Sequence, residues 1–115
     1  MLSIKVDEGY AYDYLSILYI KNLKFNTEFS NQCYSDCLYF IELQIGKELN
    51  SSIMSSEQYM NLVDANLKTF DAVEMARYGS ISAKEVDNLN MLRFKYKTEL
   101  QNKFFPNTKI AEFKS

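Results

Sequence analysis

The chain has 115 residues, a formal net charge of −2 and 47% hydrophobic residues. This length fits one domain, residues 1–115, and this hydrophobic content excludes an intrinsically disordered chain. The small net charge gives no reason to expect nucleic acid or a membrane surface as a partner. No apolar run approaches the roughly 18 residues that cross a bilayer. No signal-peptide pattern opens the chain, so we expect a cytoplasmic protein.

Residues 1–6, with the sequence MLSIKV, alternate apolar side chains with Ser3 and Lys5. This period of two predicts a half-buried strand. Because such a short strand is unstable alone, it needs a partner. We expect that partner to be the tail, from Thr108 to Phe113.

Residues 10–25, YAYDYLSILYIKNLKF, are predicted to form the first helix and the centre of the molecule. The helix is apolar on almost every side, which is typical of a helix buried among others. We expect Tyr14, Ile17, Leu18 and Phe25 to lie on its inner side. The remaining helices are then expected to cover it.

Three further helices are predicted from capping residues and periodicity. Residues 28–49 form the second, and the third begins near Ser55 or Ser56 and stops before Gly79. Ser82 with Glu85 is a capping box that opens the fourth, which ends before Pro106. With three Gly and one Pro in the chain, tight-turned sheets are not expected. The predicted fold is mainly α, an antiparallel four-helix arrangement with short N- and C-terminal β-strands.

Aromatic residues are abundant, with nine tyrosines and eight phenylalanines. One core of this size does not absorb so many large apolar side chains. We therefore expect a homo-oligomer, a dimer, that buries the rest.

Cys33 and Cys37 are the only cysteines, and the chain has no histidine. Their spacing on one helix does not suit a disulfide, so we expect free thiols in the core. Without histidine, serine–histidine and cysteine–histidine nucleophiles are excluded, and any enzyme must use carboxylates, lysine or tyrosine. We expect no cofactor and no metal site.

Two polar stripes lie beside the apolar faces of the third and fourth helices. If they face each other, Glu74 can pair with Arg93 or Arg77, while Asp13 and Lys21 of the first helix can join. One interpretation is a semi-buried ion-pair network that fixes helix register. The other is a pocket for a small anion, because the cations outnumber Glu74. The predicted ligand-binding residues are Asp13, Lys21, Asn66, Glu74, Arg77, Asn90, Arg93 and Lys97.

These observations favour a small binding or assembly module without catalysis. The alternative is a metal-dependent, all-helical phosphohydrolase. Asp71 and Glu74 have the E-x-x-D-like spacing of magnesium ligands in helical nucleotide pyrophosphohydrolases, with Glu85 and Asp87 nearby. No E-x-x-E occurs in the chain. The sequence leaves both functions open.

The same residues carry a resemblance to an uncharacterised bacterial family of small helical proteins. The family begins with G-x-x-x-D…I-L-x-I-K, which is similar to Gly9, Asp13, Ile17, Leu18, Ile20 and Lys21. Its later motifs resemble Asn66, Phe70, Glu74 and Arg77, then Asn90, Arg93, Lys97 and Leu100, then Ile110, Glu112 and Lys114. The chain departs from the family at Tyr10, Tyr14, Phe70 and Gln101, where the family has Glu, Lys, Trp and Asn. The resemblance implies a helical fold with short terminal strands and no known reaction.

Overall fold

The structure is a computed structural model, and it describes residues 4–79 and 81–107. It is mainly helical, which confirms the predicted class. The described residues form five helices, which are α1 (Glu8–Phe25), α2 (Glu28–Ile45), α3 (Lys47–Met54), α4 (Glu57–Arg77) and α5 (Ala83–Phe104).

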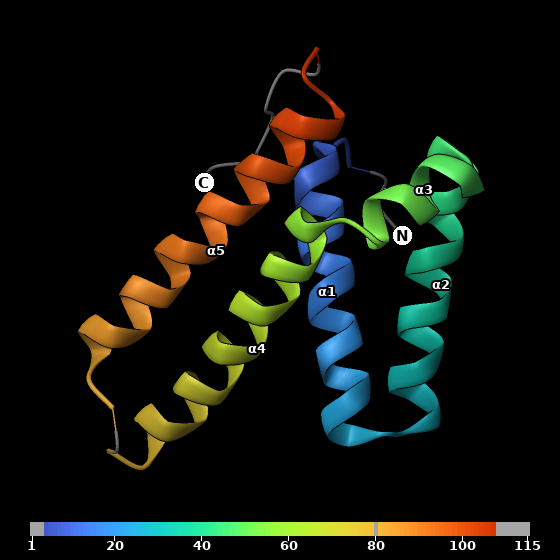
Figure 1. Cartoon of the computed structure of the whole chain (residues 1–115). Coiled ribbons are helices and arrows are strands. Elements are labelled where there is room, and N and C mark those ends of the chain that lie inside the picture. Colours follow the sequence, from blue (N-terminus) through green and yellow to red (C-terminus); the bar gives the residue numbers. More distant parts are fainter. Residues whose placement is uncertain (1–3, 80, 108–115) are drawn as a thin grey trace.

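The helix α1 stands in the middle of the molecule and contacts α2, α4 and α5 (Figure 1). The helices α1 and α2 form one antiparallel hairpin, and α4 and α5 form another. The short α3 lies at the upper right of Figure 1, between α2 and the start of α4. The prediction that later helices gather around residues 10–25 is therefore confirmed.

Side-chain caps fix the starts of the long helices. Ser82 accepts a hydrogen bond from the backbone N–H of Glu85 at 3.2 Å, at the predicted start of α5. At the start of α4, Ser56 caps the helix, through the backbone N–H of Tyr59 at 3.1 Å. Asp7 accepts from the N–H of Tyr10 at 2.7 Å, so α1 begins at Glu8, two residues earlier than predicted.

The predicted second helix, residues 28–49, is corrected by the structure. It ends at Ile45, and Gly46 has a φ of 88°, a left-handed backbone angle that interrupts a helix and that glycine adopts most readily. The chain then turns into α3, which buries Asn50 and Ile53. The predicted four-helix arrangement thus lacks α3, the helix that links the two hairpins.

The predicted N-terminal strand is wrong where it can be checked. Ile4 and Val6 are exposed and take no regular structure, because the chain leads straight into the Asp7 cap of α1. None of the described residues, 4–79 and 81–107, forms a strand. The tail from Thr108 to Phe113, and residues 1–3, lie outside the described residues.

The core lies between α1, α2, α3 and α4, and α5 closes it with the buried Leu100 and the partly buried Tyr96 and Phe104. The inner side of α1 was predicted only in part, since Leu18 is buried whereas Tyr14 and Phe25 are 52% and 58% exposed. A helix that is apolar all round has no single face that periodicity can identify. Both cysteines are free thiols, as predicted, and Cys37 packs against the core. The buried core residues are Tyr12, Leu15, Ile41, Ile53, Tyr59, Leu62 and Leu100.

Candidate functional site

A polar cluster joins α1, α4 and α5 around the carboxylate of Asp13. One oxygen of Asp13 pairs with a terminal guanidinium nitrogen of Arg93 at 3.0 Å. The other accepts a hydrogen bond from the Asn66 amide at 2.9 Å. The same amide donates to the Ser16 hydroxyl at 2.6 Å. The side chains of Arg93 and Asp13 are 26% and 14% exposed, so their ion pair is partly shielded from water.

Close packing of α1 on α5 brings Asp13 opposite Arg93. A Cβ atom on Gly9 would lie 3.0 Å from the backbone oxygen of Lys97, so only glycine fits at this contact without a shift. The backbone N–H of Gly9 donates to the Gln101 side chain at 2.6 Å. Because Asp13 lies four residues after Gly9, it stands one turn along the same face of α1.

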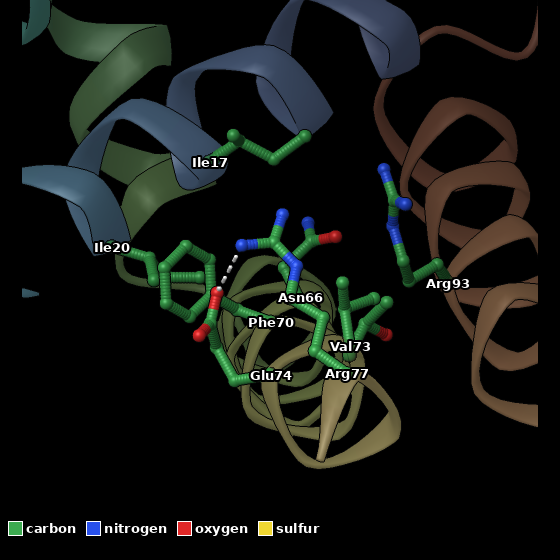
Figure 2. A pocket seen from close by; sticks show the side chains of 9 residues that line it. Ile17, Ile20, Asn66, Phe70, Val73, Glu74, Arg77 and Arg93 are labelled. Carbon is green, nitrogen blue, oxygen red and sulfur yellow. Dashed lines mark ion pairs between the residues drawn. The ribbon is translucent and has the colours of Figure 1, made fainter. Parts of the chain in front are cut away.

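A pocket of about 220 Å³ opens beside this cluster, between α1, α4 and α5. Figure 2 shows Arg77 extending into view from α4 and Arg93 from α5. Arg77 pairs with Glu74 at 3.4 Å, and both side chains are largely exposed. The Nε atom of Arg93 is buried and has no hydrogen-bond partner. The pocket is lined by Ile17, Ile20, Asn66, Thr69, Phe70, Val73, Glu74, Arg77 and Arg93.

A second hollow, of about 160 Å³, lies on the other side of Arg93. Arg93 donates to the Asn90 side chain at 3.1 Å there. The Lys97 ammonium lies 5.1 Å from the centre of the Phe94 ring. Burial lowers the pKa of Lys97, while the negative charges of Asp13 and Asp7 partly oppose that shift. The hollow is lined by Asp13, Asn90, Arg93, Phe94 and Lys97.

Seven of the eight predicted ligand-binding residues line one of these two adjoining hollows. The exception is Lys21, which is exposed on α1 and lines neither. An eight-residue separation rotates Lys21 by about 80° from Asp13 around the helix axis, which takes it off the shared face. Sequence reasoning did not include Ser16 in the site. The only feature that could have indicated it is that Ser16 carries a hydroxyl and follows Asp13 by three residues.

The two acids with the magnesium-ligand spacing, Asp71 and Glu74, each contact a base. Asp71 pairs with Lys24 at 2.9 Å, and Glu74 pairs with Arg77. Within residues 4–79 and 81–107, no group of three or more acidic or thiol side chains gathers as metal ligands would.

The chain has no match among the known proteins with which it was compared. No protein-family model matches the chain, and neither a search of curated proteins nor one of solved structures finds a similar protein. The resemblance to an uncharacterised bacterial family therefore stays a prediction. Among the described helices, none is both long enough and apolar enough to cross a membrane.

Proposed function

We propose that the chain is a binding module without catalysis, and that it takes a small anion with an apolar group in the pocket between α1, α4 and α5. The observation that supports this best concerns arginine. The chain has two arginines, Arg77 and Arg93, and both line this one pocket. Guanidinium groups bind carboxylates and phosphates through paired, charge-assisted hydrogen bonds.

The two arginines play different parts in this proposal. The terminal nitrogens of Arg93 already serve Asp13 and Asn90, so the side chain is held in place. Arg77 is held only by Glu74, and an ion pair this exposed is weak. Arg77 therefore exchanges Glu74 for an incoming anion at little cost. Asp13 pairs with Arg93 and Glu74 pairs with Arg77, so an incoming anion gains its cation by displacing Glu74 from Arg77.

Apolar side chains also line the pocket, and they favour a ligand that carries an apolar group next to its anionic group. Ile17 and Ile20 of α1 face Phe70 and Val73 of α4 across the pocket. Its volume of about 220 Å³ is below the roughly 300–1,000 Å³ of sites for drug-sized ligands. We therefore expect a short aliphatic or aromatic carboxylate, or a small phosphate ester, and we choose butyrate as the probe.

The Asp13–Arg93–Asn66 cluster also fits the other interpretation, a network that fixes helix register. That role accounts for Asp13 and Asn66 but gives no reason for Arg77, whose side chain is 69% exposed.

The phosphohydrolase interpretation needs Asp71 and Glu74 to leave their bases for a metal. Turnover of a nucleotide with magnesium that is lost in Glu74→Gln would favour that interpretation over ours.

The test is calorimetric titration and thermal unfolding with butyrate, with inorganic phosphate and nucleotides as further probes. Butyramide, which has the same shape without the charge, is the control ligand. Butyrate should raise the unfolding temperature while butyramide does not. Loss of a charge-assisted hydrogen bond costs about 1.5–3 kcal/mol, so Arg77→Gln should weaken butyrate binding about tenfold or more.

The matched control is Lys68→Gln, which removes an exposed base paired within α4 to Asp64. It should bind butyrate as the wild type does. Equal binding of butyrate and butyramide, or an equal effect of the two substitutions, would contradict the anion site.

We also propose that two copies of the chain pair through the outer face of α2. Four large apolar side chains are exposed on this helix, and a patch of this kind is typical of an interface. Sedimentation equilibrium should give a dimer, and Phe40→Lys should shift it to a monomer. The four residues are Phe29, Tyr39, Phe40 and Leu43, with 79%, 58%, 59% and 62% exposure.

A further inference from the structure

A larger pocket, of about 370 Å³, is formed by residues of α1, α2, α3 and α4. It shares no residue with the proposed anion pocket. Figure 1 shows α3 lying between α2 and the start of α4. The pocket is lined by Tyr19, Tyr34, Met54, Tyr59, Met60, Val63, Asp64 and Leu67.

Three of these residues are tyrosines, one each from α1, α2 and α4. The rings of Tyr19 and Tyr34 have centres 5.8 Å apart and are tilted by 52°, so they form two adjoining walls. Tyr59 lines the same space from α4. The faces of aromatic rings carry negative electrostatic potential, and methionine sulfur is polarisable. Met54 and Met60 also line this pocket.

The charge of the pocket also favours a cation. Its lining contains one charged side chain, the acid Asp64, and no base. Asp64 pairs with Lys68 at 2.9 Å, but the two side chains are 59% and 60% exposed. An ion pair that exposed is worth at most about 1 kcal/mol, and a bound cation can replace Lys68.

The phenol groups of Tyr34 and Tyr59 stay neutral at physiological pH. Burial raises the pKa of Tyr34 and of Tyr59, and the nearby phenols and the Cys37 thiol raise both further. Neutral phenols keep the ring faces electron-rich without adding a second charge to the pocket. A single positive charge on the ligand therefore balances Asp64.

We propose that this pocket binds a small methylated ammonium ion, of the kind that choline represents. A quaternary ammonium spreads its charge over methyl groups, which pack on ring faces and give up little hydration. A primary ammonium is strongly hydrated and loses more on entering a mostly apolar site. Val63 and Leu67 then contact the carbon chain of the ligand.

The chain's methionines provide a local readout. Of five methionines, Met54 and Met60 line the pocket, whereas Met75 and Met91 are exposed elsewhere on α4 and α5. The full-length protein with isotope-labelled methionine methyl groups is titrated with choline and followed by NMR. The comparison ligand is 3,3-dimethyl-1-butanol, which has the shape of choline but no charge.

We expect the Met54 and Met60 signals to shift with choline while Met75 and Met91 stay in place. Choline should bind about tenfold more tightly than the neutral alcohol, as expected for a cation on several rings. Absence of a shift at Met54 and Met60, or equal affinity for the two ligands, would overturn the proposal. Equal affinity would assign the pocket to neutral apolar ligands instead.

Two substitutions at Tyr19 separate the ring from its hydroxyl. Tyr19 is 37% exposed, so its replacement leaves the core in place. Tyr19→Phe should keep choline binding, and Tyr19→Leu should weaken it about fivefold. Asp64→Asn should weaken it as well, whereas Lys68→Gln should not, since it frees Asp64. Unchanged binding in both Tyr19→Leu and Asp64→Asn would overturn the cation site.

Discussion

The two sides of α1 are held to their neighbours by different physical forces. Toward α5 and the middle of α4, polar groups make specific contacts beside the apolar ones, with Asp13 receiving both Arg93 and Asn66. Toward α2, α3 and the start of α4, contact is made by large apolar side chains. There the rings of Tyr12 and Tyr59 meet edge to face at 5.9 Å. The polar side depends on a few exact partners, whereas the aromatic side depends on the amount of buried area.

This difference determines which changes destabilise each side of α1. Removal of one polar partner leaves another polar group buried and unpaired, which costs more than the lost bond itself. On the aromatic side the tyrosine hydroxyls are the weak point, because ionisation places a charge in an apolar environment. The two sides are therefore expected to respond to different perturbations.

The largest expected effect comes from Arg93→Met. It leaves the Asp13 carboxylate, 14% exposed, without its cation. Breaking a buried pair costs about 3–5 kcal/mol, and partial exposure places this one near the lower end. We expect urea unfolding to show a loss of about 3 kcal/mol.

The control combines Arg93→Met with Asp13→Asn, which removes the stranded charge and keeps an acceptor for Asn66. The double variant should recover at least half of the lost stability. A single substitution that barely changes the free energy of unfolding would mean that the pair is not shielded from water.

Alkaline pH should act on the aromatic side. Burial, with the charge of Glu42 adding to it, raises the pKa of Tyr12, and burial with neighbouring phenols and a thiol raises that of Tyr59. Above the unfolded pKa of about 10 the unfolded chain releases protons that the folded chain retains. Stability is therefore fully present below pH ~10 and is lost as pH rises further, by about 1 kcal/mol per tyrosine from pH ~10 to ~11.

The measurement is urea unfolding at a series of alkaline pH values, for the wild type and for Tyr59→Phe. The variant should lose less stability over the same interval than the wild type does. Tyr78→Phe, at a residue that is 81% exposed, is the matched control and should follow the wild type. A pH dependence that is the same in all three proteins would place the sensitivity elsewhere.

Gly9→Ala tests the close contact on the polar side. The added methyl would lie 3.0 Å from the backbone oxygen of Lys97 and 3.2 Å from the Gln101 side chain. Forcing α1 away from α5 costs about 1–3 kcal/mol, while alanine regains up to about 1 kcal/mol of helix propensity. We expect a net loss of about 1 kcal/mol in the free energy of unfolding. A gain in stability would show that α5 yields easily at this contact.

The smallest effect is expected for Lys24→Gln. Lys24 pairs with Asp71 at 2.9 Å, but the two side chains are 38% and 47% exposed. Exposed pairs contribute about 1 kcal/mol or less. Chemical denaturation should detect a loss below that limit, and a loss equal to that of Arg93→Met would erase the distinction between buried and exposed pairs.

Sequence patterns predicted the features that depend on local chemistry. The Ser82 cap needs only Glu85 nearby, and the stripes with Asn66 and Arg93 follow from helix periodicity. The break at Gly46 was missed, because one glycine in a helical pattern does not reveal its backbone angle. The buried face of α1 was found only in part, since Tyr12 and Tyr14 are chemically alike and only the neighbouring helices distinguish them.

The same distinction between local patterns and contacts between helices applies to the candidate site. The residues that share a helix face were placed correctly, whereas the pairing of Arg93 with Asp13 depends on the α1–α5 contact at Gly9. Lys21 was assigned to the cluster because its distance along the helix was considered without its rotation. No sequence pattern indicated the three-tyrosine pocket, because Tyr19, Tyr34 and Tyr59 come from three separate helices.

The most direct test of the proposed anion site uses NMR of the arginine Nε–H groups. The chain has only two arginines, so its spectrum contains two such signals, and both report on the pocket. Titration with butyrate should shift both signals, with the larger change at Arg77, which exchanges Glu74 for the anion. Butyramide should shift neither. If butyrate raises the unfolding temperature while both signals stay in place, the anion binds elsewhere and the proposed site is wrong.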